Sequence, residues 1–171
     1  CMNELANAAK SKGNWAIAHE LGHVNQISPG LKWVSTTEVT NNVYSVCVRY
    51  QFGRDSMPLE QEKCNDGNNN NVLGGRFNSY LNYGIIKGEQ WLCQKGQDNM
   101  DPSKYPYGGD HFVKLCPLWQ LLLYYREIVG GEKRDWYGDV AEIVRNTDES
   151  QLTNGQLQLN FMRNTMDVVK E

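Results

Sequence analysis

The 171-residue sequence predicts a mainly α fold, and three observations lead to this prediction. Apolar residues recur at helical spacing in most of the longer segments. Alternating patterns typical of strands are scarce. Most of the helical segments also end at a glycine or a proline, which favours a turn or removes a helical hydrogen bond. We expect a single helical domain over residues 1–171, because this length suits one domain with a sizeable core.

Two helices are predicted near the start of the sequence. Residues 4–11 look like a short helix or the end of one, and residues 14–27 form the next helix. The sequence SPG at 28–30 ends it, since Pro and Gly both interrupt a helix.

A third helix is expected to begin at Ser35, Thr36 or Thr37, because each of these side chains can cap a helix N-terminus. Gly53 is a suitable residue to end it. One face of this helix carries an apolar stripe of spacing i, i+4, i+7 and i+11, formed by Val39, Val43, Val46 and Tyr50.

The middle of the chain is polar and rich in turn residues. The low-complexity stretch CNDGNNNN at 64–71 predicts an exposed loop. Short helices are predicted at 74–84 and 89–95, and the sequence YPYGGD at 105–110 predicts another loop.

The most apolar predicted helix covers residues 111–130 and is closed by Gly130 and Gly131. Two amphipathic helices follow, at about 134–147 and 155–171. A stripe along the apolar helix is expected to lie in the core: Leu115, Leu118, Trp119, Leu122 and Tyr125.

Composition excludes several classes of protein. The net charge is −3 and no basic stripe is present, so nucleic acid is not an expected partner. No apolar run approaches the roughly 18 to 20 residues of a membrane span, and no signal peptide is visible. No oligomer is expected. Both ends resemble interrupted helices, so we expect a fragment of a longer protein.

Five cysteines are widely spaced and contain no CxxC pair. This pattern is neither a disulfide framework nor a zinc-finger ligand set. We interpret them as small apolar residues of the core, with room for one disulfide bridge.

The sequence NWAIAHELGHVNQ at 14–26 contains two of the three histidines of the chain. His19 and His23 are four residues apart, so both project from one helix face. This spacing lets both imidazoles reach one metal ion at about 2.0–2.1 Å. Glu20 is rotated by about 100° from His19, beside the metal, where it can take a proton from a water molecule. The pattern is the H-E-x-x-H of zinc peptidases.

The alternative is a pair of structural histidines that contact a glutamate at the surface. However, Ile17, Leu21 and Val24 surround the motif, which predicts a helix that is largely buried. Burying unpaired imidazoles and a carboxylate is costly, and a metal ion removes that cost. The small Gly22 also permits close approach of another segment.

A catalytic zinc usually has three protein ligands and leaves one position for water. Glu38 is the best third candidate, because the next helix can turn back against the first. The alternative role for Glu38 is to stabilise a helix N-terminus, and Glu60 and Glu62 are rival ligands. Asn42 lies one turn beyond Glu38 and is either a surface residue or a partner of a ligand histidine.

The motifs W-x3-H-E-L-G-H-x2-Q and W-x4-E-V-T-N-N resemble the enhancin and enhancin-like zinc metallopeptidases of the gluzincin group, which include viral enhancins and bacterial mucin-directed enzymes. The sequence HFVKLCPLWQLLLYY at 111–125 also resembles the helix after the active site of that family. The resemblance implies one zinc per chain, bound by His19, His23 and Glu38, with Glu20 as the catalytic base.

The resemblance further implies a secreted or cell-surface endopeptidase that acts on glycoproteins such as mucins. One departure matters: gluzincins carry a β-containing lobe before the H-E-x-x-H helix, and only eighteen residues precede His19. We therefore expect the helical, C-terminal part of a catalytic domain, with one wall of the substrate cleft missing and activity in doubt.

Peptide hydrolysis also needs a second group that stabilises the oxyanion. His111, Tyr107 and Tyr105 are candidates, although each could simply pack or begin a helix. Tyr107 and Trp33 are candidate substrate contacts. Gln26 and Trp33 match the family pattern and are expected to support the site by hydrogen bonding and packing.

Two other functions remain possible at this stage. One is a module that binds glycans or glycoproteins and keeps a non-catalytic zinc; the presence of Glu20 argues against it. The other is a metal-dependent amidase of a different amide bond, because the same activated water would serve both reactions.

Overall fold

The computed structural model describes residues 13–33, 36–52, 59, 64–65, 71–72, 75–88 and 111–170. Within these ranges the fold is mainly α, as the sequence predicts. The helices are α2 (Gly13–Asn25), α3 (Thr37–Gln51), α5 (Gly75–Ser79), α6 (His111–Leu123), α7 (Trp136–Arg145) and α8 (Asn154–Val169). The strands of the described part are β1 (Cys64–Asn65) and β2 (Asn71–Val72).

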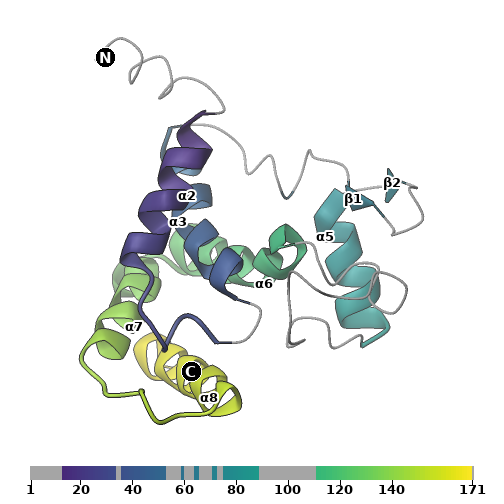
Figure 1. The fold of residues 1–171 in the computed structure, drawn as a ribbon. Coiled ribbons are helices and arrows are strands. Elements are labelled where there is room, and N and C mark those ends of the chain that lie inside the picture. Colours follow the sequence, from purple (N-terminus) through teal and green to yellow (C-terminus); the bar gives the residue numbers. More distant parts are fainter. Residues whose placement is uncertain are drawn as a thin grey trace.

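Helices α2 and α3 lie side by side (Figure 1). The helix predicted at 14–27 corresponds to α2. It ends two residues earlier than expected, at Asn25, before the Ser28–Pro29 turn. The face of α2 that is buried against its neighbours carries Ala18 and Gly22, and the buried Gln26 follows one residue after the end of the helix. Their spacing of four residues places them on one face of the helix, and two of these three side chains are small.

Helix α3 confirms the predicted third helix. Val39, Val43 and Val46 are at most 2 % exposed, so the apolar stripe lies in the core. Thr36 occupies the N-cap position, but its side chain makes no cap hydrogen bond. Its hydroxyl donates instead to the carbonyl of Trp33 at 2.7 Å, which fixes the turn that precedes α3.

Helix α6 supplies the centre of the core, as its apolar stripe predicts. Leu115, Trp119, Leu122 and Tyr125 are buried, and Leu118 packs against them from a half-buried position. The chain continues as a π-helix at Tyr124–Val129 and then as a 3-10 helix at Gly131–Asp135. Between them the backbone turns through Gly130 and Gly131, whose φ angles of 67° and 62° suit glycine.

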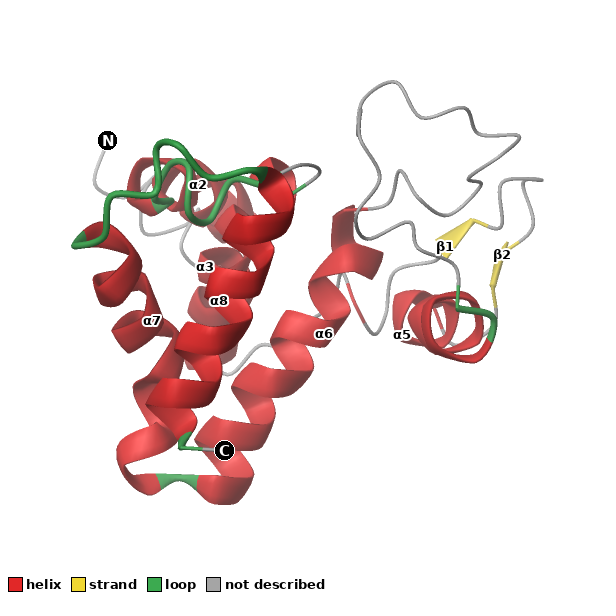
Figure 2. Ribbon diagram, turned by 90° about the horizontal axis from the view of Figure 1, so that it is seen from below, coloured by secondary structure: helices red, strands yellow, loops and turns green. Residues whose placement is uncertain are grey.

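Helix α7 packs against α8 at the C-terminal end of the chain (Figure 2). Trp136 is fully buried, and its ring lies 6.4 Å from that of Phe161. Thr153 and Gln156 form a capping box at the start of α8, which satisfies two backbone N–H groups that would otherwise lack partners.

The hairpin and α5 lie beside one end of α6, away from α7 and α8 (Figures 1 and 2). The prediction of an exposed loop at 64–71 is wrong for its described residues. Cys64 pairs with Val72 and Asn65 with Asn71 in an antiparallel hairpin. The pairing gives backbone N–H and C=O groups partners that a loop would leave to water.

The short helix predicted at 74–84 is present as α5 followed by a π-helix at Tyr80–Ile86. Three other predicted segments, at 4–11, 89–95 and 105–110, lie outside the described residues. The Cys47 thiol forms no disulfide within the described residues, and the Cys116 thiol donates to the carbonyl of Phe112 at 3.3 Å.

Candidate metal centre

Helices α2 and α3 bring His19, His23 and Glu38 together. The Nε2 atom of His19 lies 3.3 Å from Oε2 of Glu38, and that of His23 lies 3.4 Å from the same oxygen. One ligand atom from each residue falls within 4.8 Å of the others. In the part of the chain that the structure describes, this is the one cluster of three or more His, Cys, Asp or Glu residues that could hold a metal ion.

The spacing of these atoms suits zinc. In a tetrahedral site with bonds of about 2.0–2.1 Å, two ligand atoms lie about 3.3–3.4 Å apart. The two nitrogen-to-oxygen distances, 3.3 and 3.4 Å, match this edge length. Two imidazoles and one carboxylate also form a ligand set found in catalytic zinc sites, with a fourth position left for water. The residues present therefore fit a zinc ion.

Asn42 fixes the tautomer of His19. Its amide nitrogen donates to the backbone carbonyl of Glu38 at 2.8 Å, so its oxygen must face the other way. That oxygen lies 2.9 Å from Nδ1 of His19 and accepts its proton. The lone pair of His19 is consequently on Nε2, the atom that faces Glu38.

Gln26 directs its amide oxygen to Nδ1 of His23, as Asn42 does to Nδ1 of His19. Its amide nitrogen donates to the carbonyl of Thr37 at 2.9 Å and to the hydroxyl of Thr40. Its oxygen is thereby directed to Nδ1 of His23, at 3.4 Å. Gln26 is 5 % exposed, so both partners of the histidines are held by the packing of α2 on α3.

A further residue, Asn41, belongs to the site and was missed by the sequence analysis. It is fully buried, and its amide nitrogen lies 3.0 Å from Nε2 of His23 and 3.2 and 3.3 Å from Nδ1 and Nε2 of His19. The sequence contained one signal for Asn41: it follows Glu38 by three residues, a spacing that places both side chains on the same helix face.

Gly22 allows the two helices to approach, as the sequence predicts. A Cβ atom at this position would lie 2.4 Å from the backbone carbonyl oxygen of Asn41. Real Cβ atoms do not approach a backbone atom so closely, so any side chain here would separate α2 from α3. The distance between the histidines and Glu38 therefore depends on this glycine.

Gly22→Ala should destabilise the protein by about 1–3 kcal/mol, the usual cost of overpacking, and should weaken zinc binding. Urea unfolding and zinc titration measure the two effects. Gly138→Ala is the matched control, because a Cβ at Gly138 in α7 meets nothing within 4 Å. That variant should be at least as stable as wild type; equal stability of Gly22→Ala and wild type would contradict the packing argument.

Glu20 is exposed on α2, next in sequence to one ligand and three residues before the other. The expectation of a largely buried motif is wrong for the described residues. Ile17, Leu21 and Val24 are 43 %, 56 % and 80 % exposed, because α2 packs on α3 through its opposite face. The metal hypothesis therefore depends on the ligand geometry and not on a burial cost.

The remaining predicted residues are placed as follows. His111 begins α6 and is not part of the three-residue cluster. Trp33 is 6 % exposed and packs on Phe161, with ring centres 5.3 Å apart, which favours its packing role. Tyr105, Tyr107, Glu60 and Glu62 lie outside the described residues.

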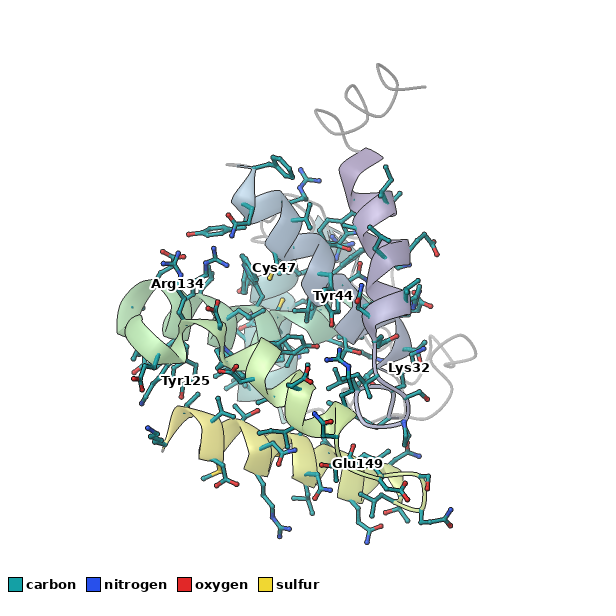
Figure 3. All side chains as sticks on the ribbon, turned by 90° about the vertical axis from the view of Figure 1, so that its left-hand side faces the viewer. Lys32, Tyr44, Cys47, Tyr125, Arg134 and Glu149 are labelled. Atoms are coloured by element: carbon teal, nitrogen blue, oxygen red, sulfur yellow. The ribbon has the colours of Figure 1, made fainter. Side chains whose placement is uncertain are left out.

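A cavity of about 230 Å³ lies on the other side of α3, between α3, α6 and the start of α7. Tyr44, Cys47 and Arg134 are among its lining residues (Figure 3). None of the three candidate ligands lines it, so this cavity is separate from the metal centre. Burial raises the pKa of the Cys47 thiol to about 11, which keeps the thiol protonated at neutral pH.

No helix in the described ranges has the length and apolar character needed to cross a membrane. Comparison with curated proteins gives no significant match. The profile of one protein family, Peptidase M60, enhancin and enhancin-like, matches residues 1–171, the whole chain. The resemblance inferred from the sequence is thereby confirmed, and the two helices described above carry a cluster of three residues that could hold a metal ion. The chain belongs to the enhancin and enhancin-like M60 family of metallopeptidases.

Proposed function

We propose that the protein is a zinc-dependent endopeptidase that hydrolyses peptide bonds of mucin-type glycoproteins. The observation that carries this proposal is the cluster of His19, His23 and Glu38, in which both Nε2 atoms lie 3.3–3.4 Å from one Glu38 oxygen. The family adds that the reaction is metal-dependent peptide hydrolysis. One zinc ion per chain is expected.

The ligand residues have defined tasks in this proposal. His19 and His23 would bind the ion through Nε2, because the side-chain oxygens of Asn42 and Gln26 lie at their Nδ1 atoms. Glu38 adds one negative charge, so the ligand set leaves a net positive charge on the ion. When bound, the zinc lowers the pKa of water toward about 7 and polarises the scissile carbonyl.

Glu20 is the proposed general base. It is exposed and lies next in sequence to the ligand His19 and three residues before the ligand His23. It can therefore accept a proton from the attacking water and return it to the leaving amine. His111 and Tyr107 are the proposed groups that donate a hydrogen bond to the developing oxyanion.

The proposed substrate class depends on the family. Enhancin-like peptidases support a glycoprotein substrate and a secreted or cell-surface location. Digestion tests should use the natural form of the protein, folded and loaded with zinc.

We expect that form to cleave an O-glycosylated mucin and to lose most of this activity when the glycans are removed enzymatically. Mass spectrometry of the products measures both reactions, and a zinc chelator should stop cleavage of the intact mucin. Equal cleavage of the deglycosylated protein would leave a peptidase but reject the mucin-type specificity. No zinc-dependent cleavage of any protein would reject the proposed function.

A further inference from the structure

The cavity on the far side of α3 from the metal centre is large enough for a small organic molecule. Its volume is about 230 Å³, whereas an apolar protein cavity of roughly 150 Å³ already binds benzene. Side chains from α3, α6, the π-helix after α6 and the start of α7 line it. One aromatic ring with a small substituent therefore fits the space.

Aromatic rings form much of the wall of this cavity. The rings of Tyr50 and Trp119 meet edge to face, with centres 5.6 Å apart and planes at 72°. The rings of Tyr44 and Tyr137 meet in the same way, at 6.4 Å and 76°. Aliphatic side chains complete the apolar lining: Val43, Leu122 and Leu123. Because aromatic rings prefer edge-to-face and offset contacts with one another, these walls favour an aromatic guest.

Two hydrogen-bond donors belong to these walls. The Tyr137 hydroxyl and the Trp119 indole N–H are buried without a hydrogen-bond partner among the described residues, and the two residues are 7 % and 3 % exposed. Burial raises the pKa of the Tyr137 hydroxyl, and the nearby Tyr44 and Cys47 raise it further. This hydroxyl therefore keeps its proton at neutral pH, and it lies close to two other groups that line the cavity. An acceptor oxygen on the guest would offer both donors a partner, and burial of a donor without one is costly.

The charged groups around the cavity balance one another. Arg126, which lines it, pairs with Glu127 at 3.2 Å. The other lining cation, Arg134, is next in sequence to Asp135, which also lines the cavity. Two positive and two negative charges cancel, so the surroundings favour a neutral guest over an ion.

We propose that this cavity binds a small, neutral aromatic molecule that carries one acceptor oxygen, such as an aryl ketone, and that Tyr137 and Trp119 donate hydrogen bonds to that oxygen. None of the candidate zinc ligands lines the cavity, so the inference does not depend on the proposed function. Water is the alternative occupant, because it would also accept hydrogen bonds from the two donors.

The test compares two probes of nearly the same shape. Acetophenone carries a carbonyl oxygen, and α-methylstyrene has a CH₂ group in its place. Titration of the folded protein is followed by nitrogen-15 NMR of the indole N–H of Trp119, the signal that Trp119→Phe removes. Acetophenone should bind saturably and shift this signal, and α-methylstyrene should bind about tenfold more weakly, because it leaves the buried donors without an acceptor.

Tyr137→Phe tests the hydroxyl directly. It removes one unpartnered oxygen and keeps the ring, so the variant should fold and should lose most of the preference for acetophenone over α-methylstyrene. Tyr124→Phe is the matched control: Tyr124 is 43 % exposed and does not line the cavity, so both affinities should stay as in wild type. Cys47→Phe places a ring in the cavity and should abolish binding of both probes.

The two probes also define the results that would overturn the inference. Equal affinity of wild type for acetophenone and α-methylstyrene would reject the two donors as the polar part of the site. The same preference in Tyr137→Phe as in wild type would reject the role of its hydroxyl. If acetophenone gives no saturable shift of the Trp119 signal, the cavity holds water only and the proposal is wrong.

Discussion

Glu20→Gln should lower turnover by about 10²- to 10⁴-fold, the range expected for loss of a general base. Glutamine keeps the size of the side chain but cannot accept a proton. The exposed position of Glu20, outside the ligand cluster, predicts that zinc content and melting temperature stay close to wild type. Cleavage of an O-glycosylated protein measures turnover, and elemental analysis measures zinc.

Glu132→Gln is the control for this variant. Glu132 is an exposed glutamate in the 3-10 helix and is not part of the ligand cluster, so the same loss of charge there should leave turnover unchanged. A binding module would show no hydrolysis in wild type, and its affinity for glycoprotein would survive Glu20→Gln. Turnover of Glu20→Gln equal to wild type would reject Glu20 as the base.

Removal of a ligand should have the largest effect on zinc affinity. His19→Ala, His23→Ala and Glu38→Ala should each weaken binding by more than the 10- to 100-fold that loss of an outer hydrogen-bond partner costs. Each substitution removes one of only three protein donors. Zinc dissociation constants, measured by chelator competition, give the comparison.

Glu60→Ala and Glu62→Ala are the controls for the third ligand, because these glutamates are the rival candidates in the sequence. Both variants should bind zinc as wild type does. If Glu38→Ala and Glu60→Ala have equal effects, the assignment of Glu38 is wrong.

The helices could be predicted from the sequence where burial follows the helical period. Val39, Val43 and Val46 show this, because their spacing places all three on the buried face of α3. The π-helices at 80–86 and 124–129 could not be predicted, since a change in hydrogen-bond register leaves the apolar period nearly unchanged. The hairpin at 64–72 was also missed, because two-residue strands have no period to detect.

The residues of the site could be predicted where they lie close together in the sequence. His19 and His23 are related by the geometry of one helix, so their spacing alone places them together. Glu38 required a turn between two helices, which Pro29 and Gly30 suggested. The position of Asn41, three residues after Glu38, indicated a shared helix face, but its contact with the histidines depends on the close approach of α3 to Gly22. The exposure of Leu21 and Val24 likewise depends on which face of α2 packs.

The central claim is that His19, His23 and Glu38 bind one zinc ion. The most direct test is elemental analysis of well-folded wild-type protein after incubation with zinc and removal of excess metal, with X-ray absorption at the zinc edge of the same sample. We predict about one zinc per chain, bound by two imidazole nitrogens and by oxygen, at the tetrahedral distances of about 2.0–2.2 Å. A folded protein that retains no zinc, or a zinc ion without imidazole ligands, would contradict the account.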